Sequence, residues 1–217
     1  VRWEKTTNNW GDVISIANTT SSEDYSDLTA TTKYRAIIQS GVCSEAISSE
    51  VTITVNEETV GGTLNSNATV CSGNNTGILE ITGQTGDIVR WEKTTNSWSD
   101  ITSISNTTTS EGYADLTTTT KYRAIIQSGV CSETTSSEVT ITIDSASTGG
   151  VLSKDTAVCE GANSGTLFLS DYTGDVLRWE FSTDDFMSST TLTNTSGTVS
   201  FSDLTEDTRY RAVVQSG

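Results

Sequence analysis

Apolar and polar side chains alternate along several short stretches of the chain. Every second residue is apolar from Val51 to Val55, and Tyr34, Ala36 and Ile38 occupy every second position of another short stretch. An alternation with a period of two predicts half-buried β-strands. Runs of Ser, Thr, Asn and Gly separate these stretches and favour turns. No segment keeps an apolar period of 3.6 residues, so we expect no helix.

The same stretches return at a fixed step of 88 residues. The aromatic residues that keep this step are Trp3, Trp91 and Trp179 in one series, and Tyr34, Tyr122 and Tyr210 in a second. A fixed period of this length indicates one compact module copied in tandem. We assign the C-terminal part of a first module to 1–57, a complete module to 58–145 and the N-terminal part of a third module to 146–217.

About seven short strands in each period are typical of a two-sheet, immunoglobulin-like β-sandwich. The expected fold class is therefore all-β, with tandem immunoglobulin-like β-sandwich repeats and no helices. The strand alternation directs the Trp3 and Tyr34 series into the core. Glu92 and Arg123 are expected to form a cross-strand charge pair on the outward faces of two neighbouring strands.

A second aromatic series lies in polar surroundings and consists of Trp10, Trp98 and Phe186. These side chains could pack as a satellite cluster over one sheet. They could also stack on a carbohydrate ligand, because aromatic rings offer an apolar face with a polar edge. The sequence favours the packing role and leaves the ligand-binding role open.

The charge of the chain limits its partners. Its 217 residues carry a net charge of −16 and include no histidine. A strongly acidic chain is a poor partner for nucleic acid, and the acidity favours solubility and repulsion between copies. A second interpretation is Ca²⁺ bound between modules, although the chain has no dense run of acidic ligands. No other metal or cofactor is expected, and no apolar run reaches the ~20 residues that insert into a bilayer.

The sequence also lacks a constellation of catalytic residues. Without histidine there is no imidazole base to activate the many serine and threonine hydroxyls. Adjacent carboxylates such as Asp184 and Asp185 are expected to be solvated. We therefore predict that the chain is not an enzyme.

Two cysteines per module keep the 88-residue step, which favours disulfides in an exported protein. A bond between Cys71 and Cys131 is preferred because a module that folds alone needs its own cross-link, although the two loops concerned usually lie at opposite ends of such a sandwich. The alternative joins Cys43 to Cys71 and Cys131 to Cys159, across neighbouring modules. Free thiols are the third reading.

Several motifs occur in a constant order along the chain. They are Thr69-Val70-Cys71-Ser72-Gly73, Val89-Arg90-Trp91-Glu92, Tyr122-Arg123-Ala124 and Gly129-Val130-Cys131-Ser132. This pattern resembles the tandem immunoglobulin-like repeats of giant Bacteroidota cell-surface adhesins, among them the gliding-motility adhesin (SprB-type). The resemblance implies type IX secretion, an extracellular location at the cell surface, and a long filament. It implies neighbouring repeats, surface polysaccharide or the motility machinery as partners.

The resemblance further implies O-glycosylation at Ser145 and Thr156, which lie in short Asp-Ser-Ala and Asp-Thr-Ala sequences. We expect a structural and adhesive repeat region, a stalk or filament, of a large secreted adhesin involved in gliding motility or surface attachment. One alternative is a carbohydrate- or protein-binding module that acts multivalently. Another is a set of accessory repeats in a secreted hydrolase.

Overall fold

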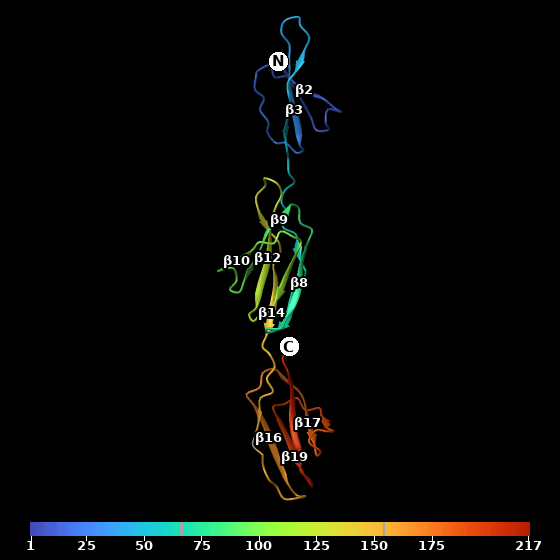
Figure 1. Ribbon diagram of the computed structural model, residues 1–217, viewed down its shortest axis with the longest axis vertical. Coiled ribbons are helices and arrows are strands. Elements are labelled where there is room, and N and C mark those ends of the chain that lie inside the picture. The colour runs from blue at the N-terminus through green and yellow to red at the C-terminus, as the bar shows by residue number, and fades with distance from the viewer. Residues whose placement is uncertain (66, 154) are drawn as a thin grey trace.

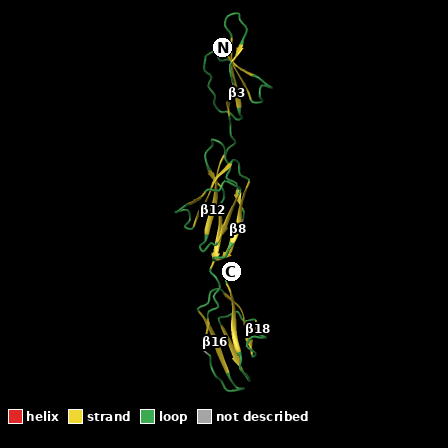
Figure 2. Ribbon diagram, viewed as in Figure 1, coloured by secondary structure: helices red, strands yellow, loops and turns green. Residues whose placement is uncertain are grey.

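The computed structural model describes residues 1–65, 67–153 and 155–217, and every regular element among them is a β-strand (Figures 1 and 2). Three modules follow one another along the long axis (Figure 1). The expected all-β fold with tandem immunoglobulin-like β-sandwich repeats is confirmed. In the described ranges, no helix has the length and apolar character needed to cross a membrane.

The middle module contains two facing sheets. The larger sheet has the order β10 (Thr102–Ile104), β9 (Asp87–Thr94), β12 (Thr120–Gln127), β14 (Val139–Asp144) and β7 (Ala68–Cys71), with β13 (Thr134–Thr135) paired to β12. The smaller sheet has the order β11 (Ser110–Ala114), β8 (Thr76–Thr82) and β6 (Thr63–Leu64). Among the described residues of this module, β7 and β14 are the one pair of strands that runs in parallel. Two such sheets form an immunoglobulin-like sandwich.

The flanking modules repeat parts of this arrangement. The first module contains β1 (Arg2–Thr6), β2 (Ile14–Ile16), β3 (Thr32–Ile38), β4 (Ala46–Ile47) and β5 (Val51–Ile53) in one sheet. The third module pairs β15 (Val151–Leu152), β16 (Ser164–Ser170) and β19 (Thr198–Ser202) in one sheet, and β18 (Thr190–Leu192), β17 (Asp175–Ser182) and β20 (Arg209–Gln215) in another.

The core of the middle module lies between its two sheets. Trp91 on β9 and Tyr122 on β12 are fully or almost fully buried and pack with Leu79 and Ile81 from β8. The indole N–H of Trp91 donates a hydrogen bond to the carbonyl oxygen of Thr108 at 3.0 Å. A buried tryptophan whose only polar atom is bonded contributes a large apolar area without leaving an unpaired donor. Burial raises the pKa of Tyr122 to about 12.

The flanking modules place their equivalent aromatic residues on the same face. Trp179 is fully buried, and Tyr210 packs partly buried against the same core. In the first module Tyr34 is buried, and Trp3 is half-buried. Trp3 and Tyr34 line a hollow together with Val51. Their counterparts in the middle module are core residues, so this hollow is a core face of the first module.

A buried asparagine fixes the turn between β7 and β8. The side-chain amide of Asn75 donates to the carbonyl oxygens of Cys71 at 2.7 Å and Leu116 at 2.8 Å. Its oxygen accepts a hydrogen bond from the backbone N–H of Leu116 at 3.0 Å. Asn163 makes the equivalent three bonds with Cys159 and Leu204 in the third module. This side chain therefore ties the end of β7 to the chain that leads into β12.

Candidate functional sites: a charged aromatic cluster and the module junction

A tight loop after β9 sets the position of Trp98. The hydroxyl oxygen of Thr94 accepts hydrogen bonds from the backbone N–H groups of Asn96 and Trp98, both at 3.2 Å. The side chain of Asn96 donates to Asp100 at 2.5 Å and accepts from the backbone N–H of Asp100 at 2.8 Å. Ser97 and Trp98 have φ angles of 57° and 70°, a left-handed conformation that side chains rarely adopt. These bonds hold the strained loop so that the indole lies over the larger sheet.

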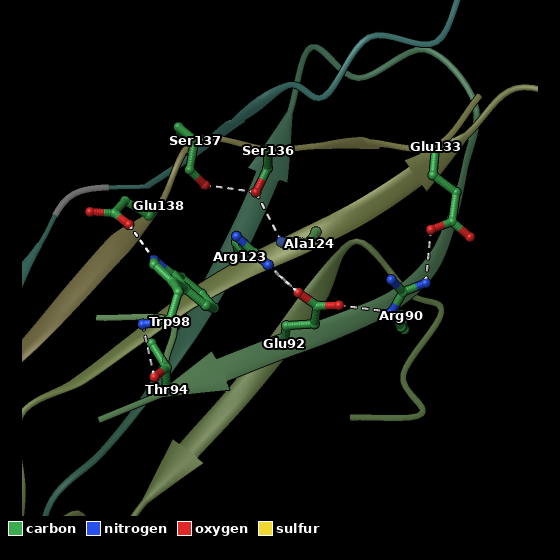
Figure 3. Close-up of polar contacts among 10 residues, drawn as sticks. All are labelled: Arg90, Glu92, Thr94, Trp98, Arg123, Ala124, Glu133, Ser136, Ser137 and Glu138. Atoms are coloured by element: carbon green, nitrogen blue, oxygen red, sulfur yellow. Dashed lines mark hydrogen bonds and ion pairs between the residues drawn. The ribbon is translucent and has the colours of Figure 1, made fainter. Parts of the chain in front are cut away.

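Below the indole, a buried carboxylate joins β9 to β12 (Figure 3). Arg123 donates to Glu92 through its Nε at 2.8 Å and its Nη2 at 2.7 Å. Arg90 donates to the other carboxylate oxygen of Glu92 at 2.9 Å, and to Glu133 at 3.0 Å. The predicted cross-strand pair between Glu92 and Arg123 is confirmed.

The electrostatics of Glu92 follow from these contacts. The side chain of Glu92 is only 5% exposed. Burial alone would raise the pKa of this carboxyl, but hydrogen bonds from Arg123 and Arg90 outweigh it, and the pKa of Glu92 lies below its usual value. Glu92 is therefore charged in the folded module at neutral pH.

The indole of Trp98 covers this ion pair. The guanidinium carbon of Arg123 lies 4.0 Å from the centroid of the Trp98 ring, a cation–π contact. The indole N–H donates to Glu138 at 2.7 Å, and Glu138 also accepts from Lys121 at 2.7 Å. We call Arg90, Glu92, Trp98, Arg123 and Glu138 the Trp98 cluster.

The other modules contain the same arrangement. In the first module, Arg35 lies 3.9 Å from the Trp10 ring centroid and contacts Glu4 at 2.8 Å. In the third module, Arg211 lies 4.1 Å from the Phe186 ring centroid and contacts Glu180 at 2.7 Å. Phenylalanine has no N–H to donate, so the ring-over-guanidinium contact is the feature common to all three.

These contacts indicate the structural role of the second aromatic series, Trp10, Trp98 and Phe186. One face of the Trp98 ring is occupied by Arg123, and its N–H is occupied by Glu138. Trp10 is engaged in the same way by Arg35 and Glu50. The cluster therefore acts as packing that covers buried charges, and the geometry does not favour the stacking of a carbohydrate on that face.

The linker between the first two modules, residues 56–60, packs on a turn of the middle module. This junction turn comprises residues 128–131, closed by a hydrogen bond from the N–H of Cys131 to the oxygen of Ser128 at 2.9 Å. The backbone N–H of Ser128 donates to the Thr59 hydroxyl at 3.1 Å. Gly129 lies so close to Asn56 that an added Cβ would collide with that side chain. The linker is thus held by the module that follows it.

The second junction repeats these contacts one period later. The backbone N–H of Ser216 donates to the Ser147 hydroxyl at 2.8 Å. Gly217 has a φ angle of 78° and lies against the carboxylate of Asp144. The sequence pattern predicts neither contact, although Thr59 and Ser147 keep a hydroxyl at the repeat step.

The structure corrects the expected disulfide between Cys71 and Cys131, because both thiols are free. Cys71, at the end of β7, is the strand-register partner of Asp144 on β14. Cys131 lies beyond the opposite end of β12, where Gln127 donates to its carbonyl oxygen at 2.9 Å. About ten residues of strand separate the two positions, roughly 30 Å, whereas a disulfide needs Cα atoms within about 7 Å.

The alternative pairing across modules does not form either. The carbonyl oxygen of Cys43 accepts a hydrogen bond from the side chain of Gln39, directly after β3, at 3.0 Å. Cys71 is the last residue of β7, in register with Asp144 at the end of β14, where the chain leaves the middle module. Cys131 and Cys159 are the counterparts of Cys43 and Cys71 one period later, so they are separated in the same way. Both pairings expected from the sequence are therefore wrong, because each would join cysteines at distant ends of the modules.

The two expected glycosylation residues lie in different surroundings. Ser145 is exposed and follows β14 directly, at the start of the second linker. Thr156 is also exposed, but its counterpart in the middle module is Ala68, which is the first residue of β7 and packs partly buried against the core. Glycosylation at both positions stays a prediction.

Metal binding and catalysis also stay predictions from the sequence. In the part of the chain that the structure describes, no group of three or more Cys, Asp or Glu side chains is arranged to hold a metal ion. The expected absence of catalysis and the alternative of calcium between modules rest on residue types alone.

A family model described as "Domain of unknown function (DUF8696)" matches residues 1–57, 60–145 and 148–217. The chain belongs to this family and contains three consecutive matches to it. It is a region of repeated β-sandwich domains. The crystal structure of the chicken CNTN1 FN1–FN3 domains is similar at 10% identity, with a TM-score of 0.33, covering 96% of this chain and 80% of that chain. No curated protein matches the sequence.

Proposed function

We propose that this chain is a structural spacer, a stalk or filament region in a large secreted adhesin at the cell surface. One observation carries this proposal: the two junctions use the same contacts between a linker and the following module. Repeated modules that contact only their neighbours form a quasi-one-dimensional array. An array with held junctions extends without folding back on itself.

Near-identity between copies supports the same function. Lys121 to Gly129 repeats Lys33 to Gly41 without a change. A set of distinct ligand sites would need different side chains in each module, whereas a spacer needs the same junction each time. The resemblance to Bacteroidota adhesins adds export by the type IX pathway, a role in gliding or attachment, and sugar on Ser145.

The spacer function can be tested by the distance between the chain ends in solution. Fluorophores at the two termini of the 217-residue chain should give a narrow distribution of transfer efficiencies. Gly129→Ala should broaden it, because the new methyl group displaces Asn56 from the junction turn. Gly41→Ala is the matched control: Gly41 has a φ angle of 55° in the equivalent turn, but nothing lies within 4 Å of the added carbon.

A broad distribution in the unmodified chain, or equal broadening by both glycine variants, would contradict the proposal. The equal strain at two left-handed positions cancels in this comparison. Only the contact with the linker then distinguishes the two variants.

A ligand-binding role can be separated from the spacer role at Trp98. If Trp98 only packs over the ion pair, Trp98→Ala should lower the local stability of the middle module and leave the retention of the chain on immobilised polysaccharide unchanged. If Trp98 binds a ligand, Trp98→Ala should reduce the retention of the chain on polysaccharide while hydrogen exchange of the backbone amides in the module stays unchanged. The contacts with Arg123 and Glu138 favour the first result.

A further inference from the structure

The complete module carries one thiol toward each of its neighbours. The Cys131 Sγ lies 3.4 Å from the carbonyl oxygen of Glu57, in the linker that enters the module. Cys71 lies at the other end, beside Asp144, where the linker to the third module begins. Neither thiol can reach the other, but each one is placed at a junction.

The Cys71 side chain points to the outer face of its sheet. Val70 and Ile143 pack against the core, and consecutive side chains of a strand point to opposite faces. Cys71 and Asp144 therefore both point outward. They are register partners on adjacent parallel strands, which lie ~4.8 Å apart. Any group that reaches the carboxylate of Asp144 on this face is close to the Cys71 thiol.

The third module does reach that carboxylate. Gly217, the counterpart of Gly129, lies against the Asp144 Oδ2. Figure 1 shows the C-terminus at this junction, beside the end of the middle module. In the first junction, Cys131 follows Gly129 by two residues and contacts Glu57. The counterpart of Glu57 is Ser145, the neighbour of Asp144 in the chain.

We propose that, where the repeat continues, the thiol at the end of a β7-type strand forms a disulfide with the junction-turn thiol of the following module. For Cys71 the partner is the cysteine that a continuing repeat would place two positions after Gly217, as Cys131 follows Gly129. For Cys131 the partner is the cysteine that the preceding module would carry one period before Cys71. This pairing places one disulfide at every junction and recurs with the 88-residue step. It differs from both pairings expected from the sequence.

The bond forms by thiol–disulfide exchange with a small-molecule disulfide such as oxidised glutathione. One thiolate attacks the glutathione disulfide and releases one reduced glutathione. The second thiolate then attacks the mixed disulfide and releases another. The two protein thiols give up two protons and two electrons, which the two released glutathione molecules carry. The inference adds a covalent bond to the proposed spacer, and the spacer function stands without it.

The test extends the 217-residue chain by Val-Cys-Ser, the tripeptide that follows Gly129. The substitutions Cys43→Ser, Cys131→Ser and Cys159→Ser leave Cys71 as the only other thiol. After treatment with oxidised glutathione, the monomer should lose the mass of two hydrogen atoms and carry no glutathione. Peptide mapping should join Cys71 to the added cysteine.

The matched control keeps Cys159 and carries Cys71→Ser instead. Cys159 occupies the far end of the third module, where Asn163 holds its carbonyl oxygen. It should therefore give glutathione adducts without an internal bond. Adducts or intermolecular dimers in place of the internal bond at Cys71 would overturn the proposal. An internal bond in both the test chain and the control would also overturn the proposal. In that case the added cysteine would bond Cys71 and Cys159 without distinction, as it would in an unfolded chain.

Discussion

The Arg123 guanidinium makes two kinds of contact at once. Its carbon lies 4.0 Å from the centroid of the Trp98 ring, and its nitrogens bind the buried carboxylate of Glu92. One side chain thus joins β9, β12 and the loop after β9 (Figure 3). Because the side chain of Glu92 is 5% exposed and that of Arg123 is 23% exposed, their charges interact more strongly than those of a fully exposed pair.

Truncating the Trp98 side chain should destabilise the middle module and leave the other two modules unchanged. Trp98→Ala removes the cation–π contact and the bond to Glu138, for an expected loss of about 1–3 kcal/mol. Trp98→Phe keeps the ring and should lose about half of that or less, since Phe186 fills the equivalent position in the third module. Amide exchange in β9 and β12 measures the loss, with β17 and β20 as an internal control. Equal losses for both variants would mean that the ring contributes nothing.

The buried carboxylate should make the stability of the middle module depend on pH. The folded pKa of Glu92 lies below its usual 4.5. Its stabilising contribution is therefore fully present above pH 4.5 and is lost as the pH falls through the folded pKa. Glu92→Gln should flatten this dependence and lower the stability at neutral pH by about 1–3 kcal/mol, because the partly buried Arg90 and Arg123 lose their charged acceptor.

Glu133→Gln is the control for this prediction. Glu133 also accepts a hydrogen bond from Arg90, but its side chain is 42% exposed, and exposed pairs contribute about 0–1 kcal/mol. Resonances of β9 and β12, followed through an acid titration, report the folded fraction of the module. A titration unchanged by Glu92→Gln would show that other carboxylates govern acid unfolding.

A glycine under an aromatic ring offers a test of the smaller sheet. Tyr113 on β11 lies over Gly77 on β8, and a Cβ at Gly77 would collide with the ring. Gly77→Ala should destabilise the module by about 1–3 kcal/mol. Gly112 is the matched control, because a Cβ there meets only the Gly77 oxygen at 3.9 Å. Thermal unfolding of the two variants measures the difference, and equal effects would remove the steric explanation.

The sequence predicts the features that depend on local alternation and on the repeat. The burial of Trp91 and Tyr122, and the pairing of Glu92 with Arg123, follow from strand periodicity and from the order of strands in such sandwiches. Glu138 lies 40 residues from Trp98 in the chain, so the bond between them depends on register. The repeat step does preserve Glu50 and Glu138, a signal that could have marked them.

The cysteines show a different limit. Their spacing suggests a disulfide, but pairing depends on which ends of the strands meet, and the 88-residue step is equally compatible with bonds within or between modules. The parallel pairing of β7 with β14 decides the matter, because it places Cys71 beside the outgoing linker. A β7 strand of four residues gives too weak a pattern to assign its partner from sequence.

Asn75 gives the prediction that most directly tests the turn carrying Cys71. This side chain is 6% exposed and makes three hydrogen bonds to the backbone of Cys71 and Leu116. Asn75→Ala should cost about 2–4 kcal/mol, because buried backbone groups lose their partners. Asn75→Asp should cost more, since it replaces the donating amide by an oxygen that faces two carbonyl oxygens.

The two variants separate hydrogen bonding from packing, because aspartate has nearly the shape of asparagine. Acidification should partly rescue Asn75→Asp, since a protonated carboxyl regains one donor, and should not rescue Asn75→Ala. Amide exchange at Ser72 and Leu116 measures both effects. A stability of Asn75→Asp equal to that of the unmodified chain would mean that the three bonds contribute little. In that case the loop leading into β12, and with it Leu116, must be held by its apolar contacts with the core.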